Sequence, residues 1–337
     1  MKNNDTATQW AVDYLESHHC RLITIQKIVE PAHSIVSKIN TSQGVFYLKQ
    51  TPPALFLEPD TISLLQTQGC QHTPTVIAKN DRYHCFLTTD CGDITLCTLF
   101  SKNKIDMSLL ARGISHYVSI QRNLEQDIPK LIAIGLPDWQ LDKFPLLYHK
   151  LLQETDLLIA DGLTPKEITT LNQAYDFCAE QCERLSKYKI PETINHCDFQ
   201  DNNMLFSEKT EEISIIDWGE AVIGHPFFSL NTCLWNLTYF HKMKQNDTQY
   251  QALQRSCVAS WLGSHEESDL IKAFNITKDL LGIFAALGYK RIYEATSNQS
   301  KTVQEEHPGS IAGCLRSFLQ IASHYQSIIH KSCRTNQ

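Results

Sequence analysis

Two short polar segments of the chain contain the residue types that phosphoryl transfer requires. Residues 196–203 read HCDFQDNN, and residues 217–220 read DWGE. In this chemistry one carboxylate orients and deprotonates the acceptor hydroxyl, while an amide and a second carboxylate hold Mg²⁺ on the phosphates of the donor. The first carboxylate has to lie on a loop and the metal-binding carboxylate at the end of a strand. An apolar, strand-like stretch precedes each segment, so the two segments indicate phosphoryl transfer.

The order and spacing of these residues also match a known catalytic pattern. His196, Asp198 and Asn203 form H-x-D-x-x-x-x-N, and Asp217 and Gly219 form D-x-G after a hydrophobic strand. Protein kinases carry the set H-R-D-x-x-x-x-N and D-F-G in the same order. A lone Asp or Asn in a turn is usually a capping or solvated residue, and a lone His is more often structural. The joint pattern is what favours a catalytic interpretation.

A kinase site also needs a lysine on the third strand of a small lobe and an acidic partner on the next helix. Lys49 follows the apolar segment 45–48 and fits the first requirement, with a solvated strand end as the alternative interpretation. Glu58, at the start of the following helix, is the preferred partner of Lys49. Asp60 is the competing candidate, because helix N-termini attract acids in any case.

The elements that must position these residues form a β-rich region followed by a helical region. The first region is expected to contain helices over 5–18 and 59–68 and strands over 21–29, 35–39, 45–49, 75–78 and 85–89. Beyond residue 93, helices are expected over 107–124, 164–185, 228–243, 250–262, 278–295 and 310–330, with a short β segment over 194–217. The sequence therefore predicts an α+β, bilobal fold. A small antiparallel lobe with one key helix (residues 1–91) precedes a larger, mainly α-helical lobe (residues 92–337).

Composition and charge exclude several classes of protein. The chain has 337 residues, 42% of them hydrophobic, which is too apolar for a disordered chain. Its 30 Lys and Arg against 37 Asp and Glu give a net charge of −7, so a nucleic-acid binder with a basic surface is not expected. Because no apolar run is long enough to span a bilayer, no membrane segment is expected either. The N-terminus is polar and the 12 cysteines form no C-x-x-C pair, which predicts a cytoplasmic protein with reduced thiols.

Together these motifs resemble the aminoglycoside phosphotransferase and choline kinase superfamily, which are small-molecule kinases with a protein-kinase-like fold. The resemblance extends from about Ile28 to the last helix and is strongest over residues 196–228. It implies that Asp198 is the catalytic base and that Asn203 and Asp217 are Mg²⁺ ligands. It also implies that Lys49 contacts the α- and β-phosphates and that His196 has a structural role.

Other contacts to the nucleotide are expected from two segments. The hinge, residues 86–92, would read the adenine edge through its backbone, which makes Thr89 and Cys91 candidate contacts. Residues 28–40 contain no glycine, so the chain departs from the Gly-rich loop of protein kinases. The turn formed by residues 31–34 would have to cover the phosphates, with Ser34 as the candidate contact. The donor is expected to be ATP, with GTP as the alternative.

The acceptor is expected to be a small hydroxylated molecule such as an aminoglycoside, an amino alcohol or a sugar. The stretch between Asp217 and His225 is too short for the activation segment on which a protein kinase binds its peptide. Asp201 and Glu220 are candidate contacts to a cationic acceptor, with solvated surface acids as the alternative interpretation. Several aromatic residues could form a box for a quaternary amine or could belong to the core: Trp235, Tyr239, Trp261, Tyr289 and Tyr293.

Three interpretations of function remain at this stage. The favoured one is an ATP- and Mg²⁺-dependent kinase of a small molecule, a monomer or a homodimer. The second is a kinase that acts on a protein. The third is a nucleotide-binding scaffold without catalysis, which the intact set of Lys49, Asp198, Asn203 and Asp217 disfavours.

Overall fold

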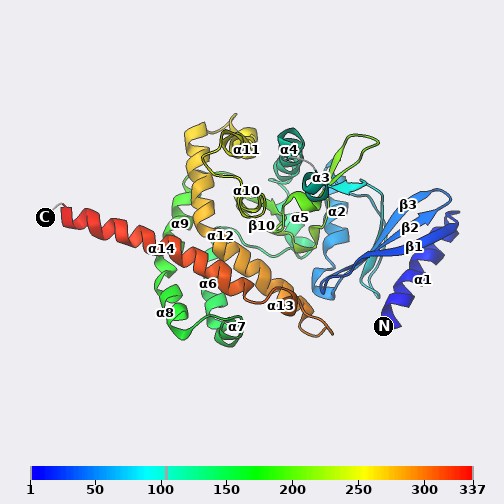
Figure 1. Ribbon diagram of the computed structural model, residues 1–337, viewed down its shortest axis with the longest axis horizontal. Helices are drawn as coiled ribbons and strands as arrows, with labels where there is room; N and C mark the ends of the chain where they lie inside the picture. Colours follow the sequence, from blue (N-terminus) through cyan, green and yellow to red (C-terminus); the bar gives the residue numbers. More distant parts are fainter. Residues whose placement is uncertain (1, 103–104, 336–337) are drawn as a thin grey trace. The chain divides into compact units, whose positions relative to one another are not determined.

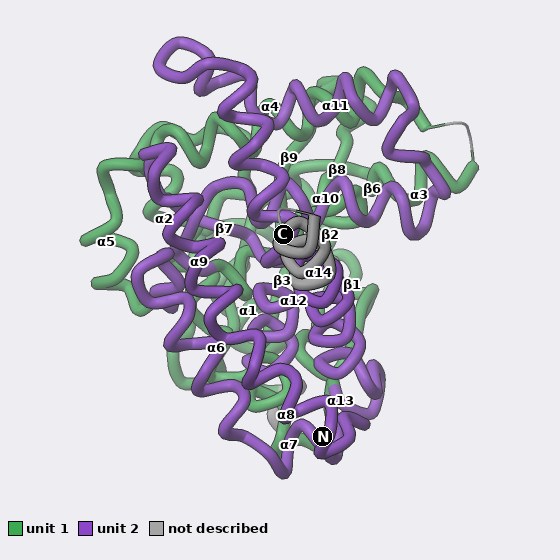
Figure 2. Tube along the Cα trace, turned by 90° about the vertical axis from the view of Figure 1, so that its left-hand side faces the viewer, with its two compact units in different colours: residues 1–136, 198–221, 292–303 green, residues 137–197, 222–291, 304–337 purple. Residues whose placement is uncertain are grey.

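The computed structural model describes residues 2–102 and 105–335 of the chain (Figure 1). These residues form two compact units, shown in Figure 2. Unit 1 contains residues 1–136, 198–221 and 292–303, and unit 2 contains residues 137–197, 222–291 and 304–337. The expected lobe boundary between residues 91 and 92 stays a prediction.

Unit 1 is built on a five-stranded antiparallel sheet. Its strands are β1 (Leu22–Val29), β2 (Ile35–Thr41), β3 (Gly44–Gln50), β4 (Val76–Asn80) and β5 (Cys85–Thr89), in the order β1-β2-β3-β5-β4. β3 therefore lies in the middle of the sheet, paired with β2 on one side and with β5 on the other. The expected strands and their antiparallel arrangement are confirmed, and a central position for β3 fixes the backbone that carries Lys49.

One helix covers a face of this sheet. α1 (Lys2–Ser17) presents small and aliphatic residues at helical spacing, namely Ala7, Ala11 and Leu15, and all three are buried. They pack against buried residues of β2, β3 and β5, including Ile39 and Leu48. Figure 1 shows α1 lying beside the sheet. Burial of the apolar face of α1 against the sheet stabilises both elements.

The second helix of unit 1 is the key helix expected after β3. The chain leaves β3 through a short 3₁₀ turn (Pro53–Leu55) and enters α2 (Glu58–Thr67). Glu58 is the first residue of α2, with Pro59 next to it in a position that suits proline at a helix start. Glu58, Thr61, Ile62 and Leu65 are buried, so α2 turns the side that begins with Glu58 toward the interior.

A small three-stranded sheet completes unit 1. Its strands are β6 (Ile94–Thr95), β8 (Met204–Phe206) and β9 (Ile213–Ile215), with β8 in the centre. Three helices also belong to this unit: α3 (Leu96–Lys102), α4 (Met107–Asn123) and α5 (Ile128–Ala133). α4 packs closely on β8, since a Cβ at Gly113 would lie 2.5 Å from Met204 Sδ. Glycine at this position therefore allows the helix to approach the strand.

Unit 2 is mainly helical. Its helices include α6 (Phe144–Gln153), α7 (Thr155–Ala160), α8 (Pro165–Gln173), α9 (Tyr175–Ser186), α10 (Phe227–Tyr239) and α11 (Thr248–Val258), together with most of α12 (Glu267–Thr296), part of α13 (Val303–Glu306) and α14 (Ser310–Thr335). One pair of strands, β7 (Thr193–Asn195) and β10 (Val222–Gly224), joins them. The expected mainly helical C-terminal region is confirmed.

The helix expected over residues 164–185 is in fact two helices. The capping box between Thr164 and Glu167 is present and opens α8. The backbone leaves helical geometry at Ala174, with φ −85° and ψ 5°, and α9 starts at the next residue. Both helices still bury the same apolar stripe, which includes Cys178 and Cys182. The hydrogen bond with Cys182 raises the pKa of the Cys178 thiol, and burial raises it further.

His225 provides a test of the packing in unit 2. It follows β10, its side chain is buried, and its Nε2 has no hydrogen-bond partner among the described residues. Burial lowers its pKa from 6.5 to about 3. Between these values the unfolded chain binds a proton that the folded chain does not, so stability falls as the pH falls through this window.

We expect His225→Gln to remove this pH dependence. In the wild type, His225 lowers the free energy of unfolding by about 2 kcal/mol as the pH falls from 6.5 to 5, at about 1.4 kcal/mol for each pH unit. Urea unfolding of both proteins at pH 7 and pH 5 measures the difference. An equal loss of stability in the two proteins would show that His225 is not the group responsible.

Candidate active site

The hairpin formed by β8 and β9 places two of the expected site residues side by side. Asn203 immediately precedes β8, and Asp217 follows β9 after one intervening residue. The pairing of Met204 with Ile215 fixes the register, and the Ile216 N–H donates to the Asn203 carbonyl at 3.0 Å. Asn203 and Asp217 therefore lie at the same open end of one hairpin.

Asp198 is held in place by two amide side chains. Its Oδ1 accepts from Gln200 Nε2 at 2.7 Å, and its Oδ2 accepts from Asn203 Nδ2 at 2.8 Å. Burial raises the pKa of Asp198 from 3.8 to about 6, with a further increase from the charge of Asp217, although both hydrogen bonds act in the opposite direction. The carboxylate is thus fixed in orientation, ionised near neutral pH and more basic than an ordinary aspartate, as suits a general base.

Lys49 bridges two carboxylates. Its Nζ lies 2.6 Å from Glu58 Oε2 and 2.5 Å from Asp217 Oδ1. Glu58 is in turn fixed by the Trp218 N–H, which donates to its other oxygen at 3.1 Å. Burial lowers the pKa of Lys49, but Asp217 and Glu58 outweigh this effect and hold it above its ordinary value. Lys49 is therefore a buried, charged and rigidly held cation.

The backbone at Asp217 turns the chain sharply after β9. Asp217 has φ 68° and ψ 56°, the left-handed conformation, and a 3₁₀ turn (Trp218–Glu220) follows it. Aspartate tolerates this conformation better than most residues do. Such conformations are often found at functional sites, and here the turn aims the Asp217 carboxylate at Lys49.

A small pocket collects most of the expected nucleotide residues. It is lined by His33, Ser34, Lys49, Thr51, Leu55, Glu58, Asp217, Gly219 and Glu220. The structure thus brings Ser34 and Glu220 together with Lys49 and Asp217. All of these residues belong to unit 1.

Five expected site residues lie outside this lining: Asp198 and Asn203, described above, and Asp201, Thr89 and Cys91. Asp201 is buried and interacts electrostatically with Cys97 of α3. Thr89 ends β5, and its N–H donates to the Thr75 carbonyl. Cys91 is half-buried next to Ser214, and burial raises the pKa of its thiol to about 12. A contact from Thr89 or Cys91 to a nucleotide stays a prediction.

Some lining residues were not expected from the sequence. Gly219 belongs to the D-x-G motif, and a Cβ there would lie 3.3 Å from Glu58 Oε2, so the motif itself was a usable signal. His33 lies in the turn that was expected to cover the phosphates. Thr51 and Leu55 follow β3 without any motif, and only the tertiary structure identifies them.

The two candidate partners of Lys49 are separated by the structure, which yields a matched prediction. Glu58 contacts Lys49, whereas Asp60 lies 2.8 Å from Lys79 at the surface. Glu58→Gln is expected to lower kcat/KM about 10- to 100-fold, because a lysine held by one carboxylate in place of two loses its orientation. Asp60→Asn should stay close to the wild type, since exposed ion pairs contribute little. Equal kinetics for the two variants would contradict a positioning role for Glu58.

The candidate metal ligands suit Mg²⁺. Asn203 donates through its Nδ2 to Asp198, so its Oδ1 is left to accept or to ligate. One oxygen of Asp217 pairs with Lys49, and this side chain is 32% exposed, which leaves it accessible to an ion. Carboxylate and amide oxygens are the ligands that this hard cation prefers.

The aromatic residues that could have formed a box have different surroundings. Trp261 is completely buried and packs against Phe227, so it belongs to the core of unit 2. Trp235 and Tyr239 stack with ring centroids 4.8 Å apart and are about half exposed. The structure therefore supports the core interpretation for Trp261.

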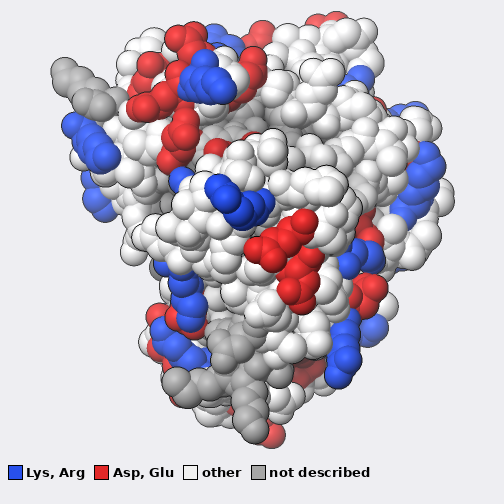
Figure 3. All heavy atoms as spheres, turned by 90° about the vertical axis from the view of Figure 1, so that its right-hand side faces the viewer, with Lys and Arg blue, Asp and Glu red and all other residues white. Residues whose placement is uncertain are grey.

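The surface charges and the helices are relevant to two classes of protein that the composition disfavours, which are nucleic-acid binders with a basic surface and membrane-spanning proteins. On the face drawn in Figure 3, basic and acidic side chains lie in small groups among uncharged residues. None of the helices in the described part of the chain combines the length and the apolar character needed to cross a membrane.

Comparisons with known proteins agree with the geometry of the site. Residues 126–261 match the sequence model of the family described as "Phosphotransferase enzyme family", and this range includes Asp198, Asn203 and Asp217. No curated protein matches the chain by sequence.

Solved structures resemble the chain over almost its entire length. Choline kinase LicA from Streptococcus pneumoniae has a TM-score of 0.60 at 10% identity, covering 94% of this chain and 99% of the other. A choline/ethanolamine kinase family protein from Mesorhizobium loti has a TM-score of 0.58 at 15% identity, covering 96% and 99%. The ADP-bound aminoglycoside phosphotransferase APH(2'')-Ib has a TM-score of 0.52 at 14% identity, covering 93% and 98%.

These findings confirm the resemblance that the motifs indicate. At such low identities the solved structures establish the fold, and the family match adds the segment with the catalytic motifs. The expectation of an enzyme, a small-molecule kinase, agrees with both. The chain thus has the protein-kinase-like fold of the aminoglycoside phosphotransferase and choline kinase superfamily and resembles its members in the catalytic segment.

Proposed function

We propose that this protein transfers the γ-phosphate of ATP, or of GTP, to a hydroxyl group of a small molecule in a Mg²⁺-dependent reaction. The observation that carries the proposal is the convergence of a base, two oxygen ligands and a buried cation. At the end of one hairpin, Asp198 accepts a hydrogen bond from Asn203, and Asp217 forms an ion pair with Lys49. The ADP-bound neighbour supports a nucleotide as the donor.

Each side chain has a definite task in this reaction. Asp198 accepts the proton of the acceptor hydroxyl as the bond from that oxygen to the γ-phosphorus forms and the bond from the γ-phosphorus to the β,γ-bridging oxygen breaks. Lys49 neutralises charge on the α- and β-phosphates, and Glu58 keeps it in position. Asn203 and Asp217 would hold Mg²⁺, which supplies charge neutralisation on the phosphates when it is bound.

Positioning and electrostatics account for catalysis in this arrangement, and no covalent intermediate on the enzyme is needed. The pKa of about 6 for Asp198 keeps most of this carboxylate ionised at pH 7. The proton it takes up passes to solvent after the transfer. Ser34, which lines the same pocket as Lys49, is positioned to contact phosphate oxygens.

The acceptor we propose is a small hydroxylated molecule, with an amine as a favoured feature. The stretch between Asp217 and His225 consists of a 3₁₀ turn and strand β10, which leaves no segment on which a peptide could lie. Glu220 lines the pocket beside Asp217 and is the best-placed acid for a cationic group. Asp201 is buried away from this lining, so we assign it a smaller part. We place the reaction in the cytoplasm, where its nucleotide is made.

A screen of acceptors tests this function. The purified protein would be incubated with ATP or GTP, Mg²⁺ and pools of aminoglycosides, amino alcohols, sugars or nucleosides, while formation of the nucleoside diphosphate is followed. We expect one pool to raise the rate well above that of Asp198→Asn, which serves as the blank. A parallel incubation contains a protein such as casein in place of the small molecules. If no pool of small molecules exceeds the blank but the added protein does, a protein kinase would replace the proposed function.

A further inference from the structure

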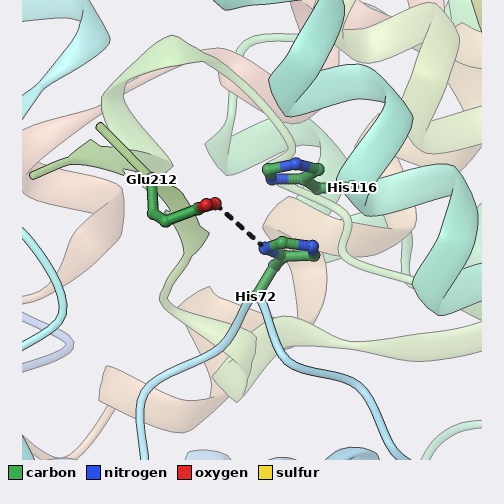
Figure 4. Close-up of side chains that lie close together, drawn as sticks. All are labelled: His72, His116 and Glu212. Carbon is green, nitrogen blue, oxygen red and sulfur yellow. Dashed lines mark ion pairs between the residues drawn. The ribbon is translucent and has the colours of Figure 1, made fainter. Parts of the chain in front are cut away.

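Two histidines and a glutamate from three separate segments of unit 1 come together away from the pocket described above. His72 lies in the connection between α2 and β4, His116 lies on α4, and Glu212 directly precedes β9. Figure 4 shows the Glu212 carboxylate directed at the His72 ring, above which the His116 ring is stacked. One ring nitrogen of each histidine and one oxygen of Glu212 lie within 4.8 Å of one another.

The hydrogen bonding of His116 leaves one of its nitrogens free for a ligand role. Its Nδ1 lies 3.0 Å from the Ile213 carbonyl oxygen. Because a carbonyl oxygen can only accept, Nδ1 carries the proton, and the neutral ring has its lone pair on Nε2. A histidine that binds a metal through one nitrogen typically donates the other N–H to a carbonyl or carboxylate. His116 therefore has the tautomer that a ligand needs.

His72 is similarly available. Its Nδ1 lies 3.9 Å from Glu212 Oε2, too far for a direct hydrogen bond. Because Glu212 does not bond directly to this nitrogen, the nitrogen can present a lone pair to an ion.

We propose that His72, His116 and Glu212 bind one Zn²⁺ ion, with a water molecule in the fourth position. Two imidazole nitrogens and one carboxylate form a common donor set for Zn²⁺. Mg²⁺ and Ca²⁺ prefer oxygen ligands only. The set therefore distinguishes this site from the oxygen ligands proposed for Mg²⁺ at Asn203 and Asp217, and the inference does not depend on the proposed function.

Binding requires a small rearrangement of the rings. They lie parallel, 7° apart in plane and 3.4 Å apart in centroid, so their in-plane lone pairs do not yet meet at one point. A common ion therefore requires at least one ring to turn about its Cβ–Cγ bond. Neither ring is fully buried and the Glu212 side chain is 58% exposed, so these movements do not require the core to shift.

The charge balance permits a cation. Arg112 is the nearby positive group, and its guanidinium donates to the Glu211 carbonyl oxygen. Glu212 contributes a negative charge 3.9 Å from His72 Nδ1. An ion coordinated directly by the Glu212 carboxylate gains more from it than it loses to the hydrogen-bonded arginine.

The site would stabilise the hairpin that carries the catalytic residues. The His72 carbonyl accepts from the Ile215 N–H at 2.8 Å, so the loop before β4 is already attached to β9. A bound ion would link this loop, α4 and the start of β9 through their side chains. Because an ion that binds only the folded chain stabilises it, Zn²⁺ is expected to raise the Tm.

Zinc binding to the full chain tests the inference. Metal-free protein is titrated with Zn²⁺ by calorimetry, and the Tm is recorded with and without the ion. The wild type is expected to bind one Zn²⁺ at this site, while His72→Gln and His116→Gln weaken binding at least about 10-fold and lose the rise in Tm. His149→Gln, a change of an exposed histidine in unit 2, is the matched control and should behave as the wild type.

A second measurement on the wild type decides the case in which a variant does not fold. X-ray absorption of the zinc-loaded protein should show two imidazole ligands and oxygen donors. Oxygen ligands alone, or sulfur ligands, would overturn the inference, as would equal Zn²⁺ affinity in the wild type and both histidine variants. Absence of Zn²⁺ binding by the wild type would overturn it as well, and the two rings would then be a packing contact only.

Discussion

Asp198→Asn is expected to lower kcat for phosphoryl transfer by about 10² to 10⁴-fold, the usual contribution of a positioned general base. The amide that replaces the carboxylate cannot accept the proton of the acceptor hydroxyl. It also meets two amide donors, Gln200 Nε2 and Asn203 Nδ2, so at least one of these hydrogen bonds is lost. Because Lys49 and Asp217 are untouched, the affinity for nucleotide should change little, which calorimetry with ADP measures.

A surface aspartate provides the matched control for this variant. Asp81→Asn makes the same chemical change at a side chain that is 78% exposed, and it should leave kcat unchanged. The wild-type pH profile of kcat/KM gives an independent check. Because Asp198 is protonated near pH 6, kcat/KM should fall tenfold for each pH unit below this value. Full turnover by Asp198→Asn would rule out the role as base.

The second large effect is expected from Lys49→Met. Removing a positioned cation from the phosphates should lower kcat by about 10² to 10³-fold and should raise the KM for the nucleotide. Stability should fall as well, because Glu58, whose side chain is 3% exposed, would be left as a buried carboxylate without its cation. Loss of one partner from a buried pair typically costs about 3–5 kcal/mol. Steady-state kinetics and urea unfolding measure the two effects.

A double variant separates the catalytic effect from the structural one. Adding Glu58→Gln to Lys49→Met removes the orphaned charge, so the double variant should be more stable than Lys49→Met but equally inactive. Lys79→Met is the matched control, since Lys79 pairs with Asp60 at the surface. If Lys49→Met kept its nucleotide affinity and kcat, the phosphate role of Lys49 would be wrong.

Much of unit 1 could be predicted because its signals are local. The bounds of β5 agree with the expected strand, and α4 ends within one residue of the expected end. Lys49 is placed by strand order, and Glu58 by the start of α2. Both depend on hydrophobic patterning over a few residues, which a single sequence displays directly.

Other features depend on contacts between distant segments, and the sequence does not display them. The break between α8 and α9 occurs within a continuous apolar stripe, so periodicity could not reveal it. The choice between Glu58 and Asp60 required the path of α2 relative to β3. Likewise, His72, His116 and Glu212 are more than forty residues apart in sequence from one to the next, and no spacing pattern connects them.

The central claim concerns where the γ-phosphate goes, and one measurement tests it directly. ATP with ¹⁸O in its γ-phosphate would be incubated with the protein, Mg²⁺ and the acceptor pool that gives the highest rate, and the products would be analysed by mass spectrometry. We expect the labelled phosphoryl group on a hydroxyl of the small molecule in the wild type, and at least about 100-fold less of it there in Asp198→Asn after the same time. Label on the protein chain, or in inorganic phosphate alone, would contradict a small-molecule kinase.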